Sequence, residues 1–212
     1  MNDLLQQFKK SKSERSDELN LRLHRSISWL TKAEQASDDL DIQFITLWIS
    51  FNAVYAKELP ERGADRASFI EFLNDICRLD TNKQLYELIW KTYSQSIRVM
   101  LDNRYIFQPF WDYQNGKIGE NIWQDDFAKA NKRAFNALAE QDTHAVLMVI
   151  FDRLYTLRNQ IVHGGATYES RLNRSQLKDG CQILLSIIPS IIQVILNNPT
   201  HNWGKPFYPV VT

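Results

Sequence analysis

Apolar residues recur at helical spacing along most of this 212-residue chain, and that periodicity constrains its fold more than any other feature. Leu19, Leu23, Ile27 and Leu30 mark a helix at about 16–36, which Ser16 can cap. The same spacing predicts further helices at about 40–58, 69–76, 85–93, 120–140, 143–163 and 170–197. Only 7 Gly and 6 Pro leave few turns for an all-β fold. The sequence therefore predicts an all-α protein.

The predicted helix at 40–58 is apolar almost all round. A helix with no polar face is buried on every side, so we expect this one at the centre of the fold. It contains Asn52, and a buried asparagine must be hydrogen-bonded. A structural polar bond is the first interpretation of Asn52, and a contact to a ligand is the alternative.

The length predicts one domain, 1–212, with a core of ordinary size. The stretch 101–123 differs from the rest because it combines Pro109, an Asn115-Gly116 turn signal and six aromatic residues. We predict a loop or short hairpin insert there. The proline-rich segment 198–212 predicts a non-helical tail, and its aromatic residues predict that it docks on the body: Trp203, Phe207 and Tyr208.

Charge, cysteine content and hydropathy favour a cytoplasmic protein without a membrane span. Basic and acidic residues balance at 25 each, so any nucleic-acid site must be a local patch. Cys77 and Cys181 have no pairing or metal-ligand spacing, which predicts free thiols in a reducing compartment. The N-terminal residues lack the apolar run of a signal peptide. The apolar stretch 183–196 is shorter than the roughly 20 residues of a membrane span, so a buried helix is predicted.

The helix at 143–163 carries the most informative pattern. One stripe of it is apolar and should pack on neighbouring helices: Leu147, Ile150, Leu154, Leu157 and Ile161. Asp152, Asn159 and His163 then point roughly the opposite way, with Tyr155 and Thr156 beside them. Solvated polar residues on an outer face, with a histidine near the negative helix end, are the ordinary explanation of such a pattern.

A resemblance adds a functional interpretation. The run Arg158-Asn159-Gln160-Ile161-Val162-His163, followed by Gly164, resembles the R-N-x-x-x-H motif of HEPN domains (higher eukaryotes and prokaryotes nucleotide-binding). The run Asn52-Ala53-Val54-Tyr55 is similar to the buried second helix of several bacterial HEPN groups. The resemblance covers most of the chain in helical layout but only these two runs in sequence.

The resemblance implies an antiparallel helical bundle that pairs as a homodimer. It also implies a metal-independent endoribonuclease without a cofactor, acting as a toxin or antiphage effector, with an antitoxin or defence-system partner as a further expectation. The catalytic residues would be Arg158, His163 and Asn159, gathered where two motifs meet across the dimer. The polar face of the predicted helix at 143–163 points away from the core of its own chain, which agrees with a site completed by a second chain.

The chemistry suits these residue types. RNA is cleaved when its 2′-oxygen attacks the adjacent phosphorus, giving a 2′,3′-cyclic phosphate and a 5′-hydroxyl. A histidine ring can act as the base or the acid of that reaction near neutral pH. The Arg158 guanidinium can pair with phosphate oxygens, and the Asn159 amide can orient the imidazole or donate to phosphate.

Weaker candidates for RNA contact are basic residues near the motif, together with Asn52: Lys129, Lys132, Arg133, Arg171, Arg174 and Lys178. Such charges on helices usually form a solvated face. The aromatic stretch can either stack unpaired bases or bury its own rings. Two alternatives to the nuclease stay open, namely a non-catalytic HEPN module that binds nucleotide, RNA or a protein partner, and an unrelated helical scaffold.

Overall fold

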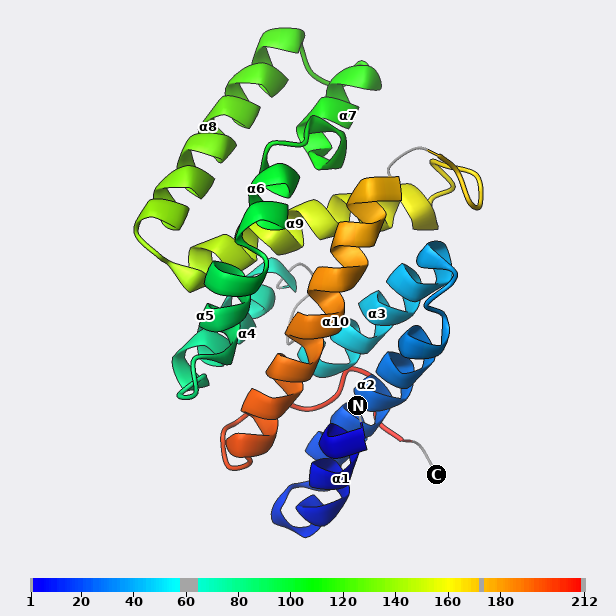
Figure 1. Cartoon of the computed structure of the whole chain (residues 1–212), viewed down its shortest axis with the longest axis vertical. Helices are drawn as coiled ribbons and strands as arrows, with labels where there is room; N and C mark the ends of the chain where they lie inside the picture. Colours follow the sequence, from blue (N-terminus) through cyan, green and yellow to red (C-terminus); the bar gives the residue numbers. More distant parts are fainter. Residues whose placement is uncertain (1, 58–64, 172–173, 211–212) are drawn as a thin grey trace. The chain divides into compact units, whose positions relative to one another are not determined.

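The computed structural model describes residues 2–57, 65–171 and 174–210, and over these residues the protein is all-α, as predicted (Figure 1). No β-strand forms in these ranges, where a single antiparallel bridge joins Lys57 to Pro206. The chain divides into two compact units. Unit 1 comprises residues 1–85 and 181–212, and unit 2 comprises residues 86–180.

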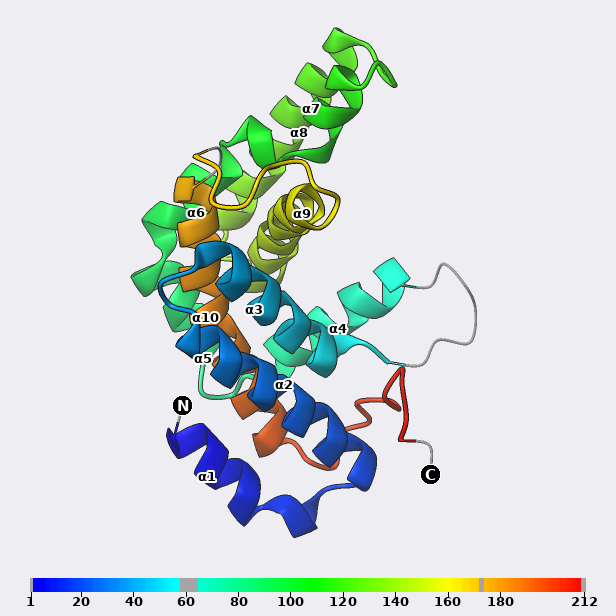
Figure 2. The same cartoon turned by 90° about the vertical axis from the view of Figure 1, so that its right-hand side faces the viewer.

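Two helices of unit 1 begin where capping side chains accept hydrogen bonds from free backbone amides. The Ser16 hydroxyl accepts a hydrogen bond from the Leu19 amide, and the Asp39 carboxylate accepts one from Ile42. These caps start the two helices that form the main hairpin of the unit, α2 and α3 (Figure 2). The helices of the unit are α1 (Asn2–Lys10), the short 3₁₀ helix η1 (Lys12–Glu14), α2 (Asp17–Gln35), α3 (Leu40–Tyr55), α4 (Asp65–Leu79), the first two residues of α5 (Gln84–Glu87) and, from residue 181 onward, α10 (Arg174–Asn197).

The core of unit 1 lies between α2, α3 and α10. Leu23, Phe44 and Leu47 are fully buried there, and the hydroxyls of Ser26 and Ser50 lie 3.0 Å apart. In α10 the apolar stretch is buried at Ile183, Leu184, Ile187, Ile188, Ile191, Ile192, Val194, Ile195 and Leu196. By length and composition α10 could cross a membrane, but 61% of its most apolar window is buried within the protein.

The prediction that α3 is buried on every side is wrong. Ile42 is 44% exposed, and Ile45, Ile49 and Asn52 are only half-buried. These residues are spaced 3, 4 and 3 apart and so share one stripe of the helix. The side-chain amide of Asn52 makes no hydrogen bond to the described residues, which contradicts the buried structural role expected for it.

Unit 2 contains the stretch predicted as a loop or hairpin insert, and this prediction is wrong because residues 101–123 are mostly helical. The Asn103 side chain accepts a hydrogen bond from the Tyr105 amide at 2.9 Å and starts a short 3₁₀ turn. Pro109 then occupies the first turn of a helix, where its missing amide costs nothing. The elements of unit 2 are the rest of α5 (Gln84–Glu87), η2 (Leu88–Thr92), α6 (Ser94–Leu101), η3 (Arg104–Ile106), α7 (Gln108–Gln114), α8 (Glu120–Ala139), α9 (Thr143–Val162) and the first residues of α10.

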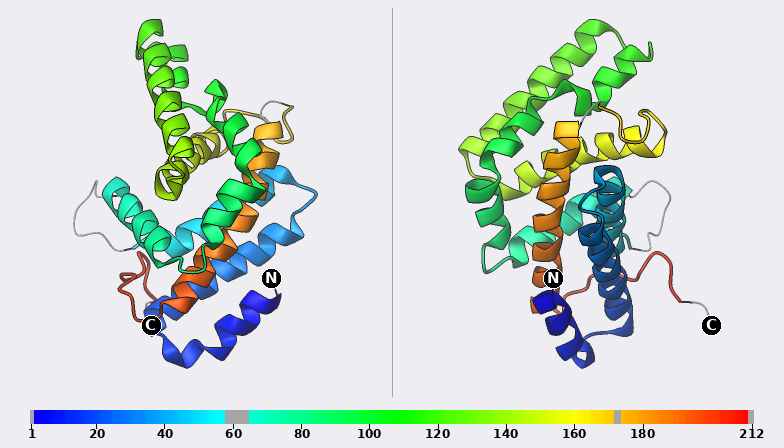
Figure 3. Two further views of the ribbon diagram at one scale, coloured as in Figure 1. Left: turned by 60° about the vertical axis from the view of Figure 1, so that its left-hand side comes forward. Right: turned by 45° about the vertical axis from the view of Figure 1, so that its right-hand side comes forward.

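The aromatic residues of this stretch hold α7 against α8 (Figure 3). The ring centroids of Phe110 and Trp123 lie 5.2 Å apart, and those of Tyr113 and Trp123 lie 6.1 Å apart. These aromatic residues therefore bury their own rings, which is one of the two roles expected for them.

Residues 198–210 contain no helix, and part of this tail packs on the helices of unit 1. Trp203 is buried against Phe72, with ring centroids 6.2 Å apart, and the His201 ring lies 3.0 Å from the Asp75 carboxylate. The docking prediction holds for Trp203. It does not hold for the rings of Phe207 and Tyr208, which are 49% and 72% exposed.

Candidate functional site

The site residues of unit 2 gather at the C-terminal end of α9, where the helix stops sharply. His163 is the last residue with near-helical geometry, and Gly164 follows it with a positive φ of 69°. The Gly165 amide donates to the Gln160 carbonyl at 2.7 Å, and the Gly164 amide donates to Ile161 at 3.1 Å. This double closure is typical of a glycine-terminated helix, and it fixes the backbone that carries His163.

The apolar stripe of α9 faces the core as the periodicity predicts. Leu147, Ile150, Leu154 and Leu157 are buried, and Ile161 is half-buried. On the other face Asp152, Tyr155 and His163 are exposed and Asn159 is half-buried. Thr156 departs from the prediction because it is only 4% exposed, and its hydroxyl donates to the Asp152 carbonyl.

Asn159 and His163 line a cavity of about 290 Å³, which we call the α9 pocket. Its other walls are Gln108, Trp111, Asn115, Thr156, Gln160 and Gly165. The Trp111 indole and the Gln160 amide both donate to the Tyr105 carbonyl, at 2.8 and 2.6 Å. These shared bonds hold α7 to the end of α9 and so form the pocket.

Arg158 does not line the α9 pocket. Its Nη1 donates to the Asn159 side-chain oxygen at 3.0 Å, and its Nε is buried without a hydrogen bond in the described part of the chain. Within one chain, Asn159 is therefore the link between the guanidinium and the pocket that holds the imidazole. The His163 ring makes no hydrogen bond to the described residues, so its two nitrogens are open to a ligand.

The sequence analysis did not identify Arg153, which is buried inside unit 2 and contacts several of its elements. Arg153 is 3% exposed, and its Nη2 donates to the Leu101 carbonyl at 3.0 Å. Its guanidinium lies over the rings of Phe107 and Phe127, at 4.5 and 5.5 Å from their centroids. Burial lowers the pKa of Arg153 to about 10. Arg153 thus ties α9 to the end of α6, to the residue before α7 and to α8.

The polar wall of the pocket on α7 was missed as well. Gln108, Trp111 and Asn115 belong to a stretch whose glycine and proline signals predicted irregular structure. Pro109 in a first helical turn is the signal that could have revealed the helix.

The weaker RNA-contact candidates are outside the α9 pocket. Lys129, Lys132, Arg133, Arg171 and Lys178 are exposed. Arg174 is half-buried and donates through Nε to the Ser170 carbonyl at 2.6 Å. Asn52 belongs to unit 1 and lines a different cavity.

No group of three or more His, Cys, Asp or Glu side chains within residues 2–57, 65–171 and 174–210 has an arrangement that could hold a metal ion. Cys77 is half-buried and Cys181 is buried, and neither forms a disulfide with another described residue. Comparisons of the chain with protein-family models, with curated proteins and with solved structures found no match.

Proposed function

We propose that this protein is a metal-independent endoribonuclease that uses His163, Arg158 and Asn159 and acts as a cytoplasmic homodimer. The observation that carries the proposal is the position of His163. Its imidazole is exposed, it lines a pocket beside Asn159, and it stands on a helix end closed by two backbone hydrogen bonds. A proton-transferring group needs such a fixed but accessible position. The R-N-x-x-x-H resemblance supplies the reaction class.

In this proposal each residue has its own role in the cleavage reaction. One imidazole takes the proton of the 2′-hydroxyl and a second gives a proton to the leaving 5′-oxygen, so that two copies of His163 serve one cleavage. Arg158 stabilises the charge on the phosphorus centre. Its bond to Asn159 turns the guanidinium toward the face that carries His163, which supports a shared role of the three side chains.

The outer face of α9 has features that support pairing of two copies. Tyr155 and Val162 are 53% and 49% exposed, and they lie seven residues apart on one stripe next to His163. A specific interface buries at least about 1,000 Å² in total, and exposed apolar side chains are the usual centre of one. A toxin or antiphage role, with an antitoxin or defence partner, belongs to the same proposal.

One observation favours a second function, a non-catalytic module that binds nucleotide, RNA or a protein partner. Arg158 is half-buried, is bonded to its own neighbour and is outside the α9 pocket. In this alternative the arginine holds the helix end in shape and the pocket only binds.

Cleavage of a labelled single-stranded RNA in excess chelator separates the two functions. The nuclease proposal expects cleavage that persists without divalent ions and a cyclic-phosphate product. His163→Ala should abolish it, whereas His24→Ala, which removes another exposed histidine, should not. RNA that binds to the wild-type protein and is never cut would support the binding module instead.

A further inference from the structure

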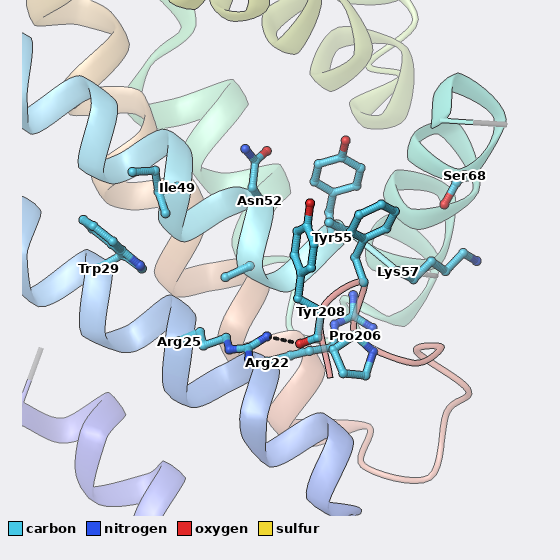
Figure 4. Close-up of a pocket in the computed structure, with 13 residues that line it drawn as sticks. Arg22, Arg25, Trp29, Ile49, Asn52, Tyr55, Lys57, Ser68, Pro206 and Tyr208 are labelled. Atoms are coloured by element: carbon cyan, nitrogen blue, oxygen red, sulfur yellow. Dashed lines mark hydrogen bonds between the residues drawn. The ribbon is translucent and has the colours of Figure 1, made fainter. Parts of the chain in front are cut away.

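Unit 1 contains a second cavity, of about 540 Å³, which we call the tail pocket because residues 206–208 of the C-terminal tail form one wall. The other walls come from α2, α3, Lys57 and Ser68 of α4 (Figure 4). Its volume lies within the range of sites for small organic ligands, about 300–1,000 Å³. Nothing in the proposed nuclease chemistry uses this cavity.

The lining of the tail pocket carries an excess of positive charge. Arg22, Arg25 and Lys57 contribute to it, and among the described residues that line it there is no carboxylate. Lys57 is neutralised by Glu71, whose carboxylate lies 2.6 Å away, but neither arginine forms an ion pair in the part of the chain that the structure describes.

Arg22 is the stronger evidence for an anion site because the residue is only 2% exposed. Its Nη atoms donate to the backbone carbonyls of Trp203, Gly204 and Val54, whereas its Nε is buried with no hydrogen bond to the residues that the structure describes. Carbonyl dipoles satisfy donors but do not cancel a full charge. Burial removes water from the cationic form and so lowers the pKa of Arg22 to about 10. An anion in the adjacent cavity would stabilise that charge.

Arg25 offers the direct contact for such an anion. It is one turn after Arg22 on α2 and donates through Nη1 to the Tyr208 carbonyl at 2.6 Å. A guanidinium has five N–H donors in a planar fork, so the donors of Nη2 and Nε are left for a ligand. A carboxylate or phosphate accepts such paired donors.

The remaining walls suit a flat ring. In Figure 4 the Trp29 indole and the Tyr208 ring stand on two sides of the space above the Arg25 guanidinium, and the Asn52 amide projects from α3 over it. Trp29 is 39% exposed and Tyr208 is 72% exposed, so both side chains have surface left for stacking, although the Tyr208 ring also contacts that of Phe207. The Asn52 amide offers one donor group and one acceptor to the edge of a ring.

We propose that the tail pocket binds a small planar aromatic anion, with its ring between Trp29 and Tyr208 and its carboxylate or phosphate at Arg25. Because the same arginine holds the Tyr208 carbonyl, the ligand and the tail share one anchor. Bound ligand should therefore also order the tail against α2.

The test is isothermal titration of the full chain with four probes that separate charge from ring. 2-Naphthoate and 2-naphthyl phosphate carry both features, 2-naphthamide lacks the charge, and cyclohexanecarboxylate lacks the aromatic ring. We expect saturable one-to-one binding of at least one aromatic anion, at least about tenfold tighter than the amide or the cyclohexane acid. Tenfold corresponds to about 1.4 kcal/mol.

Three variants locate the binding. Arg25→Gln should weaken the preferred anion at least about tenfold and leave 2-naphthamide unchanged. Trp29→Ala should weaken the preferred anion and 2-naphthamide alike, while Lys32→Gln, which removes an exposed charge from the same helix, should change affinity less than twofold. Circular dichroism melting checks that each variant is folded.

The proposal is overturned if neither aromatic anion binds saturably at millimolar concentration. It is equally overturned if the amide or the cyclohexane acid binds as tightly as the anions, or if folded Arg25→Gln binds like the wild type. The four-probe comparison on the wild-type protein decides the question even if a variant does not fold.

Discussion

The Arg158 guanidinium donates a 3.0 Å hydrogen bond to the side-chain oxygen of Asn159, the next residue along α9. Neighbouring residues of a helix point about 100° apart, so this bond draws the arginine away from the apolar stripe toward the face of His163. The motif is thus partly assembled within one chain. Its arginine and histidine still do not meet in the α9 pocket, because, of the three motif residues, only Asn159 and His163 line it.

The first prediction ranks the three motif residues in the cleavage assay. His163→Ala should lower the cleavage rate at least about 100-fold without changing the melting temperature, because its side chain is exposed. Arg158→Ala should lower the rate nearly as much and cost a little stability, since it is half-buried. Asn159→Ala should be milder because it transfers no proton. An early-melting His163→Ala together with an inactive wild type would instead identify a structural histidine.

The second prediction concerns the dimer. Val162→Glu places a charge in the exposed apolar stripe beside His163, so it should shift the protein from dimer to monomer and lower cleavage in parallel. Light scattering at micromolar protein concentration measures the oligomeric state. Val99→Glu alters a valine of α6 that is 59% exposed and should leave the dimer intact. A wild-type monomer would contradict the dimeric site.

The third prediction concerns Arg153. Arg153→Met removes the hydrogen bond to the Leu101 carbonyl and the stacking over Phe107, and it should lower the free energy of unfolding by about 2 kcal/mol. Urea unfolding followed by far-UV circular dichroism measures this loss. Arg98→Met, at an exposed position of α6, should cost less than about 0.5 kcal/mol. Equal stability of the two variants would show that the contacts of Arg153 do not stabilise unit 2.

The fourth prediction concerns Asp75 and the tail. Burial alone would raise the pKa of Asp75, but hydrogen bonds from Arg78 and His201 outweigh it and lower that pKa below its usual value. An acid with a lowered folded pKa stabilises the fold above its unfolded pKa, about 4, and loses this contribution as the pH falls through the lower folded value.

Asp75→Asn should therefore lower stability by about 1 kcal/mol at pH 7. The difference from the wild type should shrink as the pH falls below about 4. Thermal melting from pH 7 to pH 3 measures both quantities, with Asp38→Asn as the control at an exposed carboxylate. A difference independent of pH would mean that ionisation of Asp75 does not support the tail.

Much of the helical layout was predictable because helix signals are local. The helix predicted at 16–36 is α2 (Asp17–Gln35), and that predicted at 143–163 is α9 (Thr143–Val162). In each, apolar spacing defines the body and a nearby polar or glycine residue defines an end, such as Ser16 for α2 and Gly164 for α9. The prediction of a loop or hairpin at 101–123 was wrong because the helices there do not depend on local signals alone. The turn residues separate short helices, and packing between aromatic rings stabilises these helices.

The sequence by itself determined the all-α class, the apolar stripe of α9 and the outward position of His163, since each follows from helical periodicity within about 20 residues. Only the tertiary structure decided which side chains share a cavity. It joined Trp111 to His163 across about 50 residues and set Asn52 in a pocket closed by the tail. It also buried Arg153 and Arg22 with backbone carbonyls in place of carboxylates. No local pattern encodes such contacts, because they depend on where distant segments pack.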